Sequence, residues 1–402
     1  MVNILFVYPR KMATTELLYE VFVSEEAVKR GINAQFVTAD KIDNTLFGWS
    51  DVMVFVRNHD LLAQWILCKA KEKGIFCIQF FDDDIMNLSP SQVNKVQYLS
   101  WRKKAVKRGF EKTDLILSFN EMLAKKYAAL IPSGRNVTMD TVVDTSALIE
   151  PEERSKYYGD KVKLVYAAGA GHEEMFDKYV RPIIPELIRR FGNRISLTFF
   201  AVKPDFSEFK DELEIDYVPG MPLKQYRERI RSEHFDLGLS PLESNDFSQY
   251  KHFNKFMEYT IAGITGVYSN ILPYTLIVKD RVNGFLADNT YEGWLDTLCA
   301  AIEDTKTRQD CYANAYELVT GRMTPGKIID SLSKQIPELT DQIKKEKGGL
   351  GLIKIRYFLF RALECVYLVF EYIKGTGIKG TVAKIKDYRN EKQRLSAEKH
   401  GE

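Results

Sequence analysis

Short, almost wholly apolar runs alternate with amphipathic runs through most of this chain, and this alternation is the strongest constraint on its fold. In the first 145 residues the apolar runs are NILFVYP, AQFVT, DVMVFVR, IFCIQFF and DLILSF, and segments with helical periodicity lie between them at 14–31, 60–73 and 92–112. Strands that are apolar on both faces are typical of parallel sheets with helices on both sides. The pattern therefore predicts a doubly wound, Rossmann-like domain.

The alternation is interrupted once and then resumes. Residues 131–160 are rich in proline, glycine and charge, which predicts a linker between domains. Beyond it, further apolar runs (VKLVYAAGA, ISLTFFAV, IDYVPG, FDLGLSPL and ITGVYS) alternate with predicted helices at 173–191, 222–232, 250–263 and 291–303. We expect an α/β protein with two Rossmann-like domains, 1–147 and 148–340, which face a central cleft, followed by a tail, 341–402.

Composition narrows the class of partner and the compartment. The net charge of +2 gives no strong attraction to nucleic acid, which we do not expect as a partner. The five cysteines form no CxxC pair, which favours a reducing compartment. The sequence has no signal-peptide pattern at its start and no charge-free apolar run of the ~18 residues that a membrane span needs. We expect a cytoplasmic body.

Three charged side chains in the second series have a helical spacing. Lys251, Lys255 and Glu258 are separated by four and three residues, so a helix over 250–263 would place them on one face. Two ammonium groups followed by a carboxylate suit a nucleoside diphosphate, with the lysines on the phosphates and the acid on the ribose hydroxyls. The alternative is a surface Lys–Glu pair, which contributes little.

The region around these residues resembles a known family. Residues 137–320 resemble the C-terminal half of the family 4 glycosyltransferases, which have the GT-B fold, and the first domain resembles theirs only in plan. Asp144 matches the acid of the family's interdomain linker, and VKLVYAAGAGH looks like the opening of its second domain. The other matching residues are Glu258, Gly263, Val267, Ser269, Pro273, Tyr274, Asn283–Leu286, Trp294, Asp304 and Arg308.

This resemblance implies a function and a set of site residues. It implies transfer of a hexose or deoxyhexose, with retention, from a nucleoside diphosphate donor to a glycan or lipid-linked acceptor in surface-polysaccharide or glycoconjugate biosynthesis. The sugar nucleotide is a co-substrate, and no further cofactor is expected. In the family the acid at Glu258 contacts the donor ribose, while Lys251 and Lys255 would stabilise the leaving diphosphate.

The sequence departs from the family pattern at two places. An earlier acid of the family is replaced by Tyr250, so Glu243 or Asp246 would have to act in its place. The family's Arg…Lys pair after the first strand of the second domain is replaced by a glycine-rich turn and a histidine. These residues, Gly169, Gly171 and His172, are expected to face the donor phosphates.

Three consecutive acids in the first domain are candidates for the acceptor side. Asp82, Asp83 and Asp84 directly follow a predicted buried strand. Asp82 and Asp84 would hold the acceptor or take up the proton of its hydroxyl, whereas the alternative is a cluster that caps the next helix. The spacing also fits a DxD metal motif, but two lysines can neutralise a diphosphate without metal, so we expect none.

The tail predicts an amphipathic helix. Leu352, Ile355, Phe358, Leu359, Leu363, Val366, Val369, Phe370 and Ile373 share one face of a helix over 351–374, and its six charged residues fall on the other. Together with the basic segments 351–389 and 101–112, this favours docking on an anionic membrane surface. Packing of this face on the first domain, or self-association, are the alternatives.

Two other functions fit the same fold. One is a nucleotide-sugar epimerase, and the other is a non-catalytic nucleotide-sugar-binding protein, which Tyr250 favours. A dinucleotide-dependent dehydrogenase is disfavoured because no G-x-G-x-x-G follows an early strand.

Overall fold

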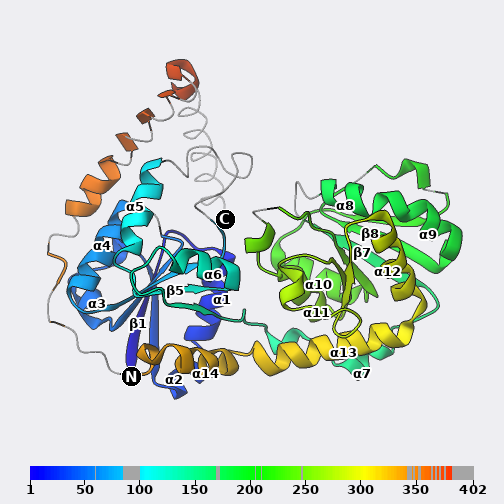
Figure 1. The fold of residues 1–402 in the computed structure, drawn as a ribbon, viewed down its shortest axis with the longest axis horizontal. Coiled ribbons are helices and arrows are strands. Elements are labelled where there is room, and N and C mark those ends of the chain that lie inside the picture. The colour runs from blue at the N-terminus through cyan, green and yellow to red at the C-terminus, as the bar shows by residue number, and fades with distance from the viewer. Residues whose placement is uncertain are drawn as a thin grey trace, which may run out of the picture.

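The structure is a computed structural model. It describes residues 1–58, 60–84, 100–168, 173–203, 205–209, 211–245 and 248–341, together with residues 346, 349–351, 355–363, 365–366, 369–370, 373–374 and 377–382 of the tail. Figure 1 shows two α/β domains side by side, the first drawn from blue to cyan and the second in green.

The first domain is built on a six-stranded parallel sheet in the order β2-β1-β3-β4-β5-β6. Its strands are β1 (Val2–Tyr8), β2 (Ile32–Thr38), β3 (Val52–Val56), β4 (Phe76–Phe81), β5 (Leu115–Ser118) and β6 (Asn136–Thr138). The register sets Ile4 of β1 opposite Val52 of β3 and Ala34 of β2. Because β1 and β3 to β5 are apolar on both faces, helices must cover both sides of the sheet.

Six helices provide that cover in the first domain. They are α1 (Ala13–Phe22), α2 (Glu25–Lys29), α3 (Asn44–Trp49), α4 (Leu61–Glu72), α5 (Ser100–Phe110) and α6 (Glu121–Ala128). Asp43, Asp60 and Asn120 cap α3, α4 and α6 by accepting a backbone N–H with their side chains. The predicted helix over 14–31 is divided in two, because Ser24 caps the start of α2.

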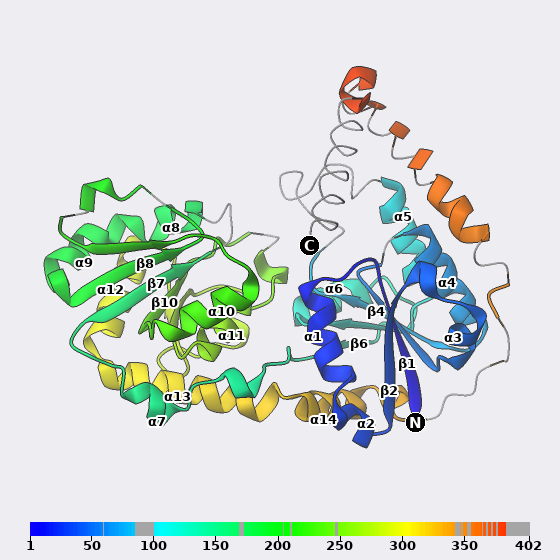
Figure 2. The same ribbon diagram turned by 180° about the vertical axis from the view of Figure 1, so that it is seen from behind.

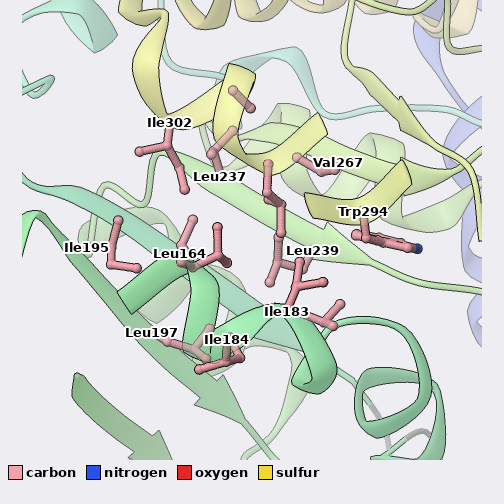
Figure 3. Close-up of a cluster of buried hydrophobic side chains, with 14 of the residues drawn as sticks. Leu164, Ile183, Ile184, Ile195, Leu197, Leu237, Leu239, Val267, Trp294 and Ile302 are labelled. Carbon is pink, nitrogen blue, oxygen red and sulfur yellow. The ribbon is translucent and has the colours of Figure 1, made fainter. Parts of the chain in front are cut away.

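The second domain repeats the plan with a six-stranded parallel sheet in the order β12-β11-β10-β7-β8-β9. Its strands are β7 (Val162–Ala167), β8 (Ile195–Phe200), β9 (Glu214–Val218), β10 (Leu237–Ser240), β11 (Thr265–Ser269) and β12 (Phe285–Ala287). Its helices include α8 (Glu173–Tyr179), α9 (Ile184–Phe191), α10 (Leu223–Ser232), α11 (Asn254–Ile261) and α12 (Tyr291–Glu303). In Figure 3, Leu164, Leu197, Leu237 and Leu239 of the sheet gather with Ile184 and Trp294 of α9 and α12 in one buried cluster.

The chain crosses between the domains twice. The first crossing follows β6 and includes α7 (Pro151–Ser155), where the buried Arg154 donates to the carbonyl of Gly263 at 2.6 Å and pairs with Asp236 at 3.0 Å. The second crossing is α13 (Thr305–Arg322), which leads into α14 (Pro325–Gln335) and the short turn η8 (Pro337–Leu339). Figure 2 shows α13 and α14 running along one side of both domains.

Helix α14 completes the core of the first domain. Ile328, Ile329 and Leu332 are buried with the apolar side chains of β1 and α1. Ion pairs hold this segment, since Arg30 of α2 contacts Asp330 at 2.5 Å and Arg135 contacts Glu338 at 2.6 Å. Sequence analysis assigns residues 325–340 to the second domain, whereas their side chains pack in the first.

The predicted α/β class and two-sheet architecture are confirmed, and every predicted strand is present. Strands β6 and β12 and helices α3, α6, α7, α13 and α14 were not predicted. The predicted helix over 250–263 is shorter than expected, because α11 begins only at Asn254 and a separate turn, η6 (Ser248–Tyr250), precedes it. No helix in the described part of the chain is long and apolar enough to span a bilayer.

Candidate functional site

Charged side chains gather where strands β3 and β4 of the first sheet end. Arg57 follows β3 directly with a φ of +48°, a left-handed conformation that is strained for a residue other than glycine. Its guanidinium donates to the carboxylates of both Asp82 and Asp83, which follow β4. The hydroxyl of Thr14, at the start of α1, donates to the second oxygen of Asp82. The strained backbone thus holds one cation between two acids.

The third acid is buried and fully engaged. Asp84 accepts hydrogen bonds from Lys126 at 2.7 Å and from the Tyr127 hydroxyl at 2.8 Å, both on α6. Its side chain is 1 % exposed, while that of Asp83 is 36 % exposed. The prediction that Asp84 holds the acceptor or takes up its proton therefore does not fit the structure, because α6 occupies both of its carboxylate oxygens. Asp82 and Asp83 lie nearer to solvent.

A short segment of the second domain contacts this edge of the first domain. We call residues 248–253 the junction segment. The side-chain amide of Asn120 donates to the carbonyls of Gln249 at 3.0 Å and Lys251 at 2.8 Å. The ammonium of Lys126 lies 4.0 Å from the centre of the Tyr250 ring, and His252 bonds to Thr141 at 3.0 Å. The junction segment follows β10, so the contact joins the carboxyl-end edges of the two sheets.

Lys251 lies in the junction segment and not on helix α11. Its backbone N–H donates to the carbonyl of Ser248, which closes the turn η6 before the helix starts. The prediction that Lys251, Lys255 and Glu258 share one helical face is therefore wrong for Lys251. Burial lowers the pKa of Lys251, and the nearby Asp83 opposes that shift. Burial likewise raises the pKa of Asp83, against the effect of Arg57 and Lys251.

Lys255 and Glu258 do share a face of α11, and they form an ion pair. Their side chains are 26 % and 33 % exposed, so both are accessible to a ligand. Lys255 is in the first turn of a helix that follows a parallel strand, which places it at the ligand-binding edge of the second sheet. Burial raises the pKa of Tyr226 on α10, and the negative charge of Glu258 adds to the shift, which locates that carboxylate beside the tyrosine.

Of the remaining predicted residues, two lie in the described part of the chain and four do not. Glu243 follows β10 but pairs with Lys178 of α8 on the surface, at 2.5 Å, so the structure does not bring it to Glu258. Tyr250 packs against the first domain. Gly169, Gly171, His172 and Asp246 lie outside the described residues.

Sequence reasoning missed several residues of this site. Arg57 stands directly after a buried strand and Asn120 two residues after one, the same signal that pointed to Asp82, and both could have been found by it. His252 carried no such signal. Its ring nitrogens bond to Thr141 and Asn254, and burial lowers its pKa to about 4, so it is neutral at physiological pH.

The arrangement suits recognition of a charged, hydroxyl-rich ligand. Lys255 and Lys251 provide positive charge near the carboxyl-end edge of the second sheet, which can stabilise a diphosphate. Glu258 provides acceptor oxygens for hydroxyl groups, and Asp82 and Asp83 provide them from the opposite domain. Such a site can hold two substrates, one on each domain.

Two Rossmann-like domains, joined at the carboxyl-end edges of their sheets and bridged by a C-terminal helix that returns to the first domain, define the GT-B fold. Solved structures agree. HepE of Anabaena, in a crystal structure with UDP-glucose, has a TM-score of 0.55 and 12% sequence identity, covering 84% of this chain and 100% of that chain. The sucrose-phosphate synthase of Thermosynechococcus elongatus has a TM-score of 0.55 and 10% identity, covering 84% and 99%.

An alpha-glucosyltransferase crystallised with UDP and a 13-mer DNA is also similar. Its TM-score is 0.53 at 13% identity, covering 84% of this chain and 99% of that chain. At these identities the likeness establishes the fold. No protein-family model and no curated protein sequence matches the chain.

Proposed function

We propose that this protein is a glycosyltransferase that transfers a hexose or deoxyhexose from a nucleoside diphosphate donor to a glycan or lipid-linked acceptor, with retention of anomeric configuration. The observation that carries the proposal is the Lys255–Glu258 pair on α11, with Lys251 between it and the first-domain acids. The GT-B fold, whose solved examples include proteins with UDP or UDP-glucose bound, supports a nucleotide-sugar donor.

On the donor side, each side chain has a distinct role. Glu258 accepts hydrogen bonds from the ribose hydroxyls, which requires that Lys255 turn from the carboxylate towards the diphosphate. Lys251 supplies the second positive charge as the bond to the sugar breaks and negative charge develops on the leaving group. Because Lys251 is partly buried, its charge acts in a medium of lower dielectric constant than water.

On the acceptor side, Asp82 and Asp83 bind hydroxyl groups of the incoming glycan. Arg57 donates to both carboxylates and orients them, and Asp84 fixes α6 behind them. A carboxylate in this position also takes up the proton that the attacking hydroxyl releases. We propose that the reaction belongs to polysaccharide or glycoconjugate biosynthesis at the cytosolic face of a membrane, consistent with five free cysteines in a reducing compartment.

Donor binding and turnover test the proposal. Calorimetry with UDP-glucose and other nucleoside diphosphate sugars should identify a donor for the wild-type protein. Glu258→Ala should weaken that donor's binding ~10- to 100-fold, because it removes hydrogen bonds to a charged acceptor. Asp82→Asn should leave donor affinity unchanged and lower the transfer rate, since it alters only the acceptor side.

The matched control is Asp310→Ala, which breaks an exposed Lys–Asp pair on α13 and should change neither quantity. Unchanged donor affinity in Glu258→Ala would show that Glu258 does not contact the donor. Donor isomerisation without transfer would instead identify an epimerase, and tight donor binding without any turnover a binding protein. NMR of the product's anomeric proton decides between retention and inversion.

A further inference from the structure

The tail carries an apolar helical face that is exposed in the described part of the protein. We call the following exposed side chains the apolar stripe: Ile355, Phe358, Leu359, Leu363, Val366, Val369, Phe370 and Ile373. Phe358 is 71% exposed, Val366 is 68% exposed and Phe370 is 61% exposed. Their spacing of three and four residues places them along one side of a helix. Exposed apolar side chains in such a continuous row indicate an interaction surface.

The other side of the same helix is attached to the first domain. Tyr357 and Phe360 pack against the apolar cluster between α4 and the sheet. The guanidinium of Arg356 lies 4.7 Å from the centre of the Trp65 ring on α4. The alternative that the apolar face itself packs across the first domain therefore does not hold for the described residues, because those contacts use the opposite side.

The sequence that carries the apolar stripe has a net positive charge. Segment 351–389 contains eight lysines and arginines against three acids. Helix α5, which packs on α4 beside the start of the tail, exposes Lys104, Lys107 and Arg108 and buries Ala105, Val106 and Phe110. An apolar helical face with basic flanks is typical of helices that lie in the interface of an anionic bilayer.

The same charge disfavours a second copy of the chain as the occupant. Pairing two stripes face to face would bring the basic flanks of both copies together, and like charges repel. An anionic lipid surface satisfies the apolar stripe and the basic residues at once. The positive charge therefore favours an anionic bilayer over a second copy of the chain as the partner of the apolar stripe.

The position of the tail sets the orientation of the protein on such a surface. In Figures 1 and 2, β1 starts at the lower end of the first domain and runs upward, while α5 and the tail rise at the upper end. The tail thus leaves the first domain on the side where its parallel strands end, which is also the side of Arg57 and Asp82.

We infer that the apolar stripe and the exposed lysines and arginine of α5 form one docking surface for an anionic lipid bilayer, which turns the acceptor edge of the first domain towards the membrane. That this edge binds the acceptor rests on the proposed function. The acceptor would then be a sugar chain whose lipid anchor is embedded in the same bilayer. The docking itself does not depend on any reaction.

Vesicle co-sedimentation of the full chain tests the inference. The wild-type protein should bind vesicles of phosphatidylcholine mixed with phosphatidylglycerol, bind vesicles of phosphatidylcholine alone far more weakly, and dissociate as salt is raised. The double variant Phe358→Asp/Phe370→Asp should lose at least ~10-fold in affinity, because two aromatic side chains no longer enter the interface. The control Tyr291→Asp alters an exposed aromatic residue in the first turn of α12, where an acid is tolerated, and should bind as the wild type does.

Two outcomes would overturn the inference: equal vesicle binding by the double variant, or a wild-type dimer in lipid-free solution that the double variant converts to monomer. Calorimetry with UDP-glucose on the same variants separates the two proposals. Unchanged donor affinity together with lost vesicle binding supports docking. Loss of both vesicle binding and donor affinity would show that the double variant disturbs the fold. In that case the vesicle test is repeated with the milder variant Phe358→Ser.

Discussion

At the scale of single residues, the site depends on charges that are held by partners from both domains. Arg57 donates to two acids from a left-handed backbone conformation, and Asp84 is buried only because Lys126 and Tyr127 satisfy it. Burial lowers the pKa of His252, in the junction segment, to about 4, and His252 contacts the first domain through Thr141. The stability of the junction therefore depends on pH.

We predict that protonation of His252 loosens the protein between pH 6.5 and about 4. Burial lowers its pKa from 6.5 to about 4, although Asn254 and Asp82 oppose the shift. In this window the unfolded chain binds the proton and the folded chain does not, so the free energy of unfolding falls as pH falls. Urea unfolding at pH 7 and pH 5 should show a larger loss for the wild type than for His252→Gln. Equal losses would contradict the prediction.

Single residues were also where sequence reasoning was weakest. A carboxylate after an apolar strand is visible in the sequence, so Asp82 could be placed at the end of β4, but the burial of Asp84 beneath α6 could not be foreseen. Helical spacing correctly paired Lys255 with Glu258. It failed for Lys251, because the turn η6 and the burial of Phe253 delay the start of α11, and such tertiary contacts have no local sequence signal.

At the scale of elements, helix α11 of the second domain lies very close to the sheet because strand β10 carries a glycine. A methyl group on Gly238 of β10 would approach the ring of Tyr259 on α11 to 2.6 Å, and that ring is buried. The hydroxyl of Tyr259 in turn donates to the carbonyl of Leu239 at 2.7 Å. Gly238 thus sets how closely the helix with Lys255 and Glu258 packs on the sheet.

Gly238→Ala should lower the free energy of unfolding by ~1–3 kcal/mol, because the buried ring cannot move without disturbing its hydrogen bond. Thermal unfolding would measure the loss. The control is Gly321→Ala, an exposed position in α13 with nothing within 4 Å, which should raise stability by up to ~1 kcal/mol through helix propensity. A destabilisation of equal size at both positions would contradict the packing argument.

The elements themselves were largely predictable. Most strands were recognisable because they are apolar runs between polar ones, a pattern that reflects burial in a parallel sheet. Strand β6 was missed, because three residues in a polar context carry no periodicity, and its pairing with β5 is a tertiary event.

At the scale of the whole molecule, the two domains are not separate along the chain. The apolar face of α14 looks the same in the sequence whichever sheet it covers, so the sequence could not assign it, and packing places it on the first domain. The ion pairs of Arg30 and Arg135 with Asp330 and Glu338 attach the same segment.

We predict that Ile329→Ala destabilises the first domain by ~2–5 kcal/mol, although residue 329 follows the whole second domain in sequence. Hydrogen exchange should show lost protection in β1 and β3 and unchanged protection in β7 and β8. The matched variant Leu298→Ala, in α12, should give the reverse pattern because Leu298 is buried in the second domain's core. Loss of protection in β7 and β8 of the Ile329→Ala protein would contradict this assignment.

The return of α14 has a consequence for synthesis of the protein. Strand β6 ends at Thr138, but the helix that covers the same domain starts only at Pro325, so at ~5–20 residues per second a ribosome needs ~10–40 s to deliver it. During that interval the nascent first half exposes the apolar surface that Ile328, Ile329 and Leu332 later cover. Translation that stops before residue 325 would therefore release a chain whose first domain still exposes apolar surface, which chaperones bind.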